Sequence, residues 1–113
     1  MIKQLNYCKA FYDYNFLRSY REAVAFYDNK HNVYYLYRYN SATTRQHFYK
    51  WFKKCEEGGC NEIFITLYKF ARNHKYLYVK AVCCENGLFI AQPCTPTEYH
   101  KALGCMTYDM ERI

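Results

Sequence analysis

This sequence is poor in glycine, in acidic residues and in long apolar runs, and each shortage excludes a class of protein. Four of its 113 residues are glycine, and none falls in a G-x-x-x-x-G-K or G-x-G-x-x-G pattern, so a glycine-rich phosphate loop is excluded. Sixteen Lys and Arg outnumber ten Asp and Glu, and this net charge of +6 excludes an acidic surface that imitates DNA. No apolar run approaches the ~20 residues that cross a bilayer, and residues 1–6 carry no apolar signal segment. We therefore expect a cytoplasmic protein without a membrane partner.

Tyrosine is the residue that the sequence has in excess, with 15 copies against eight Phe and one Trp. A tyrosine has a flat apolar ring and a polar tip, so it can be buried, exposed or stacked on a ligand. Leu, Ile and Val are scarce, so the aromatic residues must build the core, a binding surface, or both. Half of the residues are apolar and under a quarter are charged, which predicts a folded globule, and the length fits one domain over 1–113.

Two segments have the start and stop signals of helices. The first is 44–57, with Thr43 as N-cap and Gly58 at its end, and the second is 96–103, which begins after Thr95 and closes at Gly104. The first helix has an apolar stripe at helical spacing, formed by Phe48, Trp51, Phe52 and Cys55. We expect this stripe to be buried.

Most of the remaining chain is predicted to form strands. They are 23–27, 33–39, 62–70, 76–84 and 88–91, separated by polar turns such as 28–32 and 85–87. Residues 2–11 are compatible with a sixth strand, and 15–21 with a turn of helix. The order is roughly β-β-β-α-β-β-β-α, which predicts a single α+β domain with an antiparallel sheet of five to six strands and two helices.

The first candidate binding surface is an aromatic platform on the hairpin formed by 62–70 and 76–84. In this pairing Phe70 faces Tyr76, Tyr68 faces Tyr78 and Thr66 faces Lys80, with Lys69, Arg72 and Lys75 nearby. The first helix adds Arg45, Tyr49, Lys50, Lys53 and Lys54 on its polar face. Such rings stack bases while the cations contact phosphates, as in single-stranded nucleic-acid binding. The alternative is that the helix covers this face and the rings are core.

The second candidate surface is the tyrosine-rich strand 33–39. Strand alternation places Tyr35, Tyr37 and Tyr39 on one face. Exposed, this row would suit a protein partner or a second copy of the chain in a homodimer. Alternatively, tyrosine fills the sheet because of its strand propensity.

The cysteines and histidines are weak candidates for chemistry. Cys55, Cys60, Cys84 and Cys94 lack the paired spacing of a zinc site, so we expect no metal and no cofactor. With no secretion signal, we expect all seven cysteines to be reduced. Cys94 precedes the second helix, whose N-terminus would lower its pKa, and His100 lies one turn further on. His47 and His74 are the other candidate catalytic bases.

These patterns lead to three functional hypotheses. The leading one is a non-catalytic binding module that engages nucleic acid or a nucleoprotein complex through a basic, tyrosine-rich surface. The composition is typical of small proteins of phages and mobile elements, which suggests the second, a protein-directed inhibitor of a host defence nuclease such as a CRISPR effector. The third is a small enzyme that uses a thiol or a histidine.

Overall fold

The computed structural model describes residues 2–5, 9–58 and 61–111, with only the backbone described for 106–111. Its centre is one antiparallel sheet of seven strands, in which each strand pairs with the next along the chain. The strands are β1 (Lys3–Gln4), β2 (Ala10–Asp13), β3 (Phe16–Ser19), β4 (Glu22–Asp28), β5 (Val33–Tyr37), β6 (Tyr78–Cys83) and β7 (Phe89–Pro93). The predicted α+β class with an antiparallel sheet is therefore confirmed, with more strands than expected.

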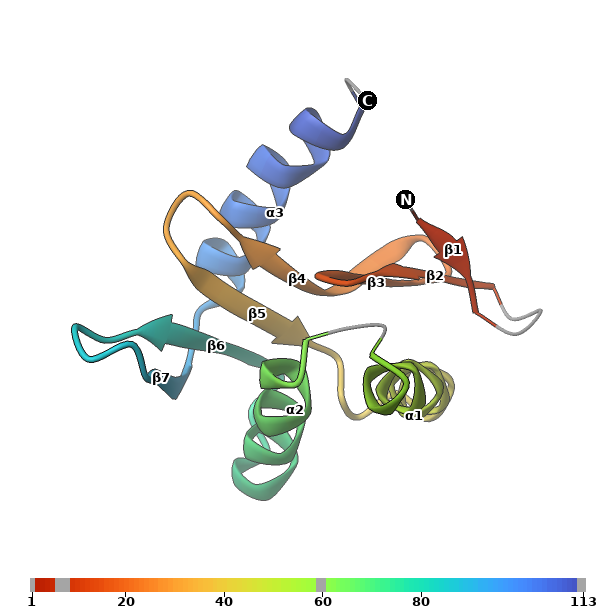
Figure 1. The fold of residues 1–113 in the computed structure, drawn as a ribbon, viewed down its shortest axis with the longest axis horizontal. Helices are drawn as coiled ribbons and strands as arrows, with labels where there is room; N and C mark the ends of the chain where they lie inside the picture. Colours follow the sequence, from red (N-terminus) through yellow and green to blue (C-terminus); the bar gives the residue numbers. More distant parts are fainter. Residues whose placement is uncertain (1, 6–8, 59–60, 112–113) are drawn as a thin grey trace.

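Three helices cover the sheet from both sides. α1 (Ala42–Glu56) and α2 (Ile63–His74) are inserted between β5 and β6, which are nevertheless hydrogen-bonded neighbours. Both lie on one side of the sheet, and α3 (Pro96–Glu111) lies on the other (Figure 1). The strand side chains alternate between these layers, so that Val79 and Ala81 of β6 meet α2 while Tyr78 and Val82 meet α3.

The segment 62–70 is the main error in the predicted secondary structure, because it is helical. Its Ile, Thr, Phe and Tyr residues have high strand propensity, which favoured the strand interpretation. In the structure its buried side chains recur at helical spacing and form one stripe: Phe64, Leu67, Tyr68 and Ala71. α2 ends where Lys75 takes the left-handed conformation, with φ of 58°.

The N-terminal third also differs from the prediction. The possible helical turn at 15–21 is instead β3, which forms a hairpin with β2 through a tight turn in which the Asn15 amide donates to Asp13 Oδ1 at 2.8 Å. The possible strand at 2–11 is divided into β1 and β2. The hairpins β4–β5 and β6–β7 lie where the sequence predicted them.

The two predicted helices are present with different ends. α1 is capped by Ser41 rather than Thr43, since Ser41 Oγ accepts from the Thr44 amide at 3.4 Å. Thr95 caps α3 as predicted, accepting from the Glu98 amide at 3.0 Å. α3 continues through Gly104 to Glu111, so that glycine does not close it.

Candidate nucleic-acid interface

α1 and α2 pack side by side through aromatic side chains, and this contact positions the candidate interface. The predicted apolar stripe of α1 is buried at Phe48, Trp51 and Cys55 and half-buried at Phe52. Trp51 meets Phe64 of α2 with ring centroids 4.8 Å apart, and Phe48 meets Tyr68 at 5.3 Å. Later residues of α1 therefore meet earlier residues of α2, which makes the pair an antiparallel helical hairpin with one face against the sheet.

On the outer side of this hairpin a tyrosine is held among arginines. The buried Tyr68 donates its hydroxyl to the hydroxyl of the exposed Tyr49 at 3.4 Å, and the Arg72 guanidinium lies 5.9 Å from the Tyr68 ring centre. The hydrogen bond from Tyr68, followed by the charges of Arg72 and Arg45, lowers the pKa of Tyr49. Burial and its bond to Tyr49 raise the pKa of Tyr68 to about 12. Tyr49 is thus a preorganised acceptor in a positive field.

The charge on these two helices is segregated. Residues 42–54 contain four Lys or Arg and residues 63–76 contain three, and neither range contains Asp or Glu. The carboxylates nearest to these ranges in the sequence are the exposed Glu56, which is the last residue of α1, Glu57 after it, and Glu62 just before α2. We call the exposed Lys and Arg side chains on the two helices, together with Tyr49, the α1–α2 face: Arg45, Tyr49, Lys53, Lys69 and Arg72.

A second exposed aromatic group lies where α2 ends. The His74 ring lies 4.5 Å from Phe70 and stacks on Tyr76 at 5.7 Å with an interplanar angle of 12°. Tyr76 is 39 % exposed, and Lys75 beside it is exposed as well. We call Phe70, His74 and Tyr76 the α2 aromatic cluster. It places flat rings next to the last cations of α2.

The structure brings together part of the predicted aromatic platform and separates the rest. Phe70 and Tyr76 do approach, at 5.9 Å between ring centres, but through the turn that ends α2. The other two predicted pairings are wrong, because Tyr68 and Thr66 lie on α2 while Tyr78 and Lys80 lie on the sheet face that α3 covers. The helical conformation of 62–70 is the physical reason.

Several predicted contact residues are engaged within the protein. Lys80 donates to Glu98 of α3 at 2.8 Å, and Lys54 to Glu57 at 3.2 Å. Tyr78 stacks on Tyr37 at 4.3 Å, and burial with the hydrogen bond to Tyr37 raises its pKa to about 12. Lys50 is half-buried on α1. These side chains are less available to a ligand than the α1–α2 face.

The tyrosine row of strand 33–39 does not form an exposed surface. Tyr35 is buried and Tyr37 half-buried, both against Tyr99 of α3, at ring distances of 6.0 and 5.4 Å. Arg38 takes the left-handed conformation, with φ of 70°, and ends the strand, so Tyr39 packs into the core on the opposite side. β5 lies between β4 and β6, so its edges are paired and it cannot join a second copy.

The thiols and imidazoles do not assemble into a recognisable catalytic group among the described residues. Burial, followed by the charge of Glu98, raises the pKa of Cys94 to about 11, opposite to the expected lowering. Burial and the charge of Lys50 lower the pKa of His47, whose Nδ1 lies 2.7 Å from the buried Ser19 Oγ. His100 contacts the Tyr78 hydroxyl at 3.4 Å, and His74 belongs to the α2 aromatic cluster.

The candidate metal ligands are not gathered either. In the described part of the chain, no three His, Cys, Asp or Glu side chains come together as metal ligands would. Cys84 and Cys94 are half-buried free thiols, and Cys60 lies outside the described residues. Cys55 is disulfide-bonded, so the expectation that every cysteine is reduced is wrong.

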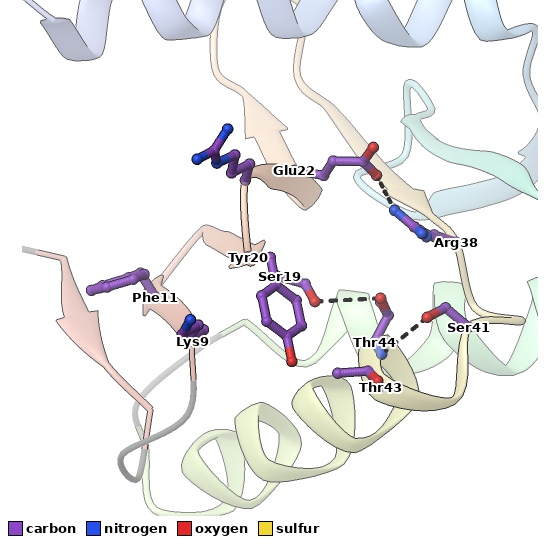
Figure 2. Close-up of a pocket in the computed structure, with 10 residues that line it drawn as sticks. Lys9, Phe11, Ser19, Tyr20, Glu22, Arg38, Ser41, Thr43 and Thr44 are labelled. Carbon is purple, nitrogen blue, oxygen red and sulfur yellow. Dashed lines mark hydrogen bonds and ion pairs between the residues drawn. The ribbon is translucent and has the colours of Figure 1, made fainter.

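Sequence reasoning missed a cavity of about 720 Å³ beside the start of α1 (Figure 2). Its cationic lining residues, Lys9, Arg21 and Arg38, are 12 and 17 positions apart and lie in or beside turns. No periodic pattern connects such positions, and only the folding of the meander brings them together.

The fold defines this protein as an α+β domain built on a sequential seven-stranded antiparallel meander with helices on both faces. A family model described as a family of unknown function, DUF8033, matches residues 1–66, more than half of the chain, and the protein belongs to that family. No curated protein and no solved structure matches it. Of the helices within the described residues, none is long and apolar enough to cross a membrane.

Proposed function

We propose that this protein is a non-catalytic binding module that holds single-stranded nucleic acid on the α1–α2 face and the α2 aromatic cluster. The observation that carries the proposal is the segregation of charge: seven Lys or Arg and no carboxylate over residues 42–54 of α1 and residues 63–76, which comprise α2 and the turn that ends it. A surface of one sign attracts a polyanion from solution and gains affinity by releasing its condensed counterions.

Aromatic side chains complete this surface. Tyr49 is 47 % exposed and lies within the fields of Arg45 and Arg72. The α2 aromatic cluster adds a stacked, exposed pair beside Lys75. Single-strand binders combine cations that follow the backbone with rings on which bases stack, and they show little sequence preference. Paired bases are inaccessible to such rings, so we expect single strands to bind more tightly than duplex.

The test is fluorescence anisotropy with labelled single-stranded DNA, single-stranded RNA and duplex DNA across a range of salt concentrations. A double variant, Arg45→Gln with Arg72→Gln, removes two phosphate contacts. For a single strand it should flatten the slope of log K against log salt by about 1.4. The matched control is Lys30→Gln with Lys101→Gln, which removes the same charge at exposed positions away from the α1–α2 face. The control should keep the wild-type slope.

Two results would overturn this function. One is the absence of binding to every nucleic acid at low salt, and the other is an equal loss of slope in the control. Tight one-to-one capture of a host nuclease without affinity for free nucleic acid would then favour a protein-directed inhibitor, of the kind encoded by phages, over a nucleic-acid binder.

A further inference from the structure

The cavity beside α1 is built from segments that are distant in sequence. It lies where residues next to β2, the β3–β4 turn and the residues leading into α1 meet, and it has a volume of about 720 Å³ (Figure 2). Pockets for small ligands typically range from ~300 to ~1,000 Å³. The volume therefore suits a small organic molecule better than a single ion.

The lining of the cavity is positively charged. Lys9, Arg21 and Arg38 contribute three cations, and among the described lining residues Glu22 is the one carboxylate. Glu22 forms an ion pair with Arg38 at one side of the cavity (Figure 2), which leaves the charges of Lys9 and Arg21 uncompensated within the lining. Hydroxyl groups of Thr43 and other Ser and Thr residues also line the space. Cations together with hydroxyl donors form the environment that phosphate oxygens prefer.

The aromatic ring of Tyr20 also lines this cavity. Tyr20 is 52 % exposed, and Figure 2 shows its ring between β3 and the first turn of α1. Its backbone is left-handed, with φ of 57°, an uncommon conformation for a tyrosine, which the Tyr20 amide stabilises by donating to the Lys9 carbonyl at 2.7 Å. One side of the ring lies 5.7 Å from the His47 imidazole. The backbone of Tyr20 is thus held by a hydrogen bond, and its ring has an exposed surface on which a base can stack.

We propose that this cavity binds a phosphorylated nucleotide, with the phosphate against Lys9 and Arg21 and the base on the Tyr20 ring. The combination of uncompensated cations, hydroxyl donors and an exposed aromatic ring matches the two ends of that ligand. The ligand is either a free mononucleotide or the 5′-phosphate end of a strand, which present the same chemistry. This inference uses none of the residues of the α1–α2 face and stands independently of it.

The test uses the full chain, isotope-labelled, in NMR titrations with adenosine 5′-monophosphate, adenosine and inorganic phosphate. The monophosphate should shift the amides of Tyr20, Arg21 and Thr43 and bind about tenfold more tightly than either fragment. Arg21→Gln should weaken the binding of adenosine 5′-monophosphate about tenfold. Tyr20→Leu should reduce the affinity advantage of the monophosphate over inorganic phosphate. Lys101→Gln, an exposed charge loss on α3, is the control and should have no effect.

A second arm distinguishes the two sources of the ligand. A 5′-phosphorylated oligonucleotide that outbinds its 5′-hydroxyl counterpart, with the advantage lost in Arg21→Gln, identifies strand ends. Equal binding of the two oligonucleotides together with tight monophosphate binding identifies a free nucleotide. The proposal is overturned if the monophosphate leaves the cavity amides unshifted, or if Arg21→Gln and Lys101→Gln affect it equally. Neither result depends on Arg45 or Arg72, so each is separate from failure of the proposed function.

Discussion

The two faces of the sheet use tyrosine to different extents. On the α3 face, Tyr35, Tyr37 and Tyr78 surround the fully buried Tyr99 and together form a small core. On the α1–α2 side, the buried Tyr34 and Tyr68 share a larger core with Phe, Trp and Leu, and Tyr49 lies at the rim beside arginines. Tyrosine is thus found in both cores, and the hydroxyl groups on the two faces have different partners.

Tyr99 is buried because its hydroxyl has a backbone partner. It donates to the Ala23 carbonyl at 2.6 Å, while its ring makes edge contacts with Phe26 and Tyr35. A phenol without such an acceptor would carry a desolvation penalty in the interior. Tyr49 has no comparable site in the core, and its hydroxyl instead accepts from Tyr68 at the surface. Tyr99 is therefore satisfied by a backbone acceptor inside the protein, whereas the equally buried Tyr68 donates its hydroxyl to the exposed Tyr49.

The largest predicted effect is on the α3 face. Tyr99→Ala removes the ring around which this core is built and should lower the free energy of unfolding by about 3–5 kcal/mol. Tyr99→Phe keeps the ring and loses the bond to Ala23, so it should cost about 1–3 kcal/mol. Urea denaturation followed by circular dichroism measures both. If Tyr99→Phe stayed folded but lost nucleic-acid binding, the assignment of purely structural and binding roles to the two faces would be wrong.

A smaller effect is expected at Cys94, on the same face. Burial raises its pKa from 9.0 to about 11, so near pH 8 the folded protein should hold about 100-fold less thiolate there than the unfolded chain does. Alkylation with iodoacetamide, followed site by site by mass spectrometry with and without urea, checks this. The exposed Cys105 serves as the internal control. Fast alkylation of native Cys94 would revive the thiol-enzyme hypothesis.

The parts of the fold that were predicted correctly are those that depend on residues close together in the sequence. Both hairpins and the N-caps of the helices depend on neighbouring residues, and the sequence predicted Asn86–Gly87 as a turn and Thr95 as a cap. The prediction for segment 63–74 was wrong because its β-branched and aromatic residues are compatible both with a strand and with the apolar stripe of a helix. Its pairing with Trp51 and Phe48 of α1 is a tertiary contact that decides in favour of the helix.

The candidate site was predictable in composition but not in arrangement. Arg45, Tyr49 and Arg72 were each identified from the sequence, yet their convergence requires two antiparallel helices that the predicted strand at 62–70 excluded. The predicted exposure of the tyrosine row on strand 33–39 was wrong because Tyr99 of α3 packs against that face of the strand. The cavity lining comes from strands, turns and the start of α1 that are far apart in the chain, so sequence spacing contains no signal for it.

The next prediction tests the comparison of the two sheet faces at Tyr49, the exposed tyrosine on α1. Tyr49→Ala should weaken single-strand binding by about 1–3 kcal/mol, because a stacking ring is lost. Its effect on unfolding should be about 1 kcal/mol, since the side chain is 47 % exposed but its hydroxyl is the acceptor for the buried Tyr68. The matched control is Tyr14→Ala, which removes a similarly exposed ring in the β2–β3 turn. Equal losses of binding in both variants would show that Tyr49 is not part of a specific surface.

The smallest effect is a difference in pH response between the two faces. Burial lowers the pKa of His47 on α1 below 6.5, so as the pH falls past that value the unfolded chain takes up a proton before the folded protein does. Stability should therefore decrease below about pH 6.5 and be level just above it. On the α3 face the raised pKa of Cys94 acts in the opposite direction, and stability should decrease as the pH rises from about 9 toward 11. Tyr78 on the same face and Tyr68 on α2, whose pKa values are raised to about 12, add to the loss above about pH 10.

Urea midpoints across this range separate the two contributions. His47→Asn, which keeps a polar group near Ser19, should remove the acid-side slope and leave the alkaline side unchanged. His31, paired with Asp28 at 2.8 Å, is present in both proteins and cancels in the comparison. If the variant kept the wild-type slope below pH 6.5, His47 would not be the group that makes the α1 side acid-sensitive. The acid response would then have to come from an ionisable group elsewhere in the protein, and the two faces would no longer differ in this respect.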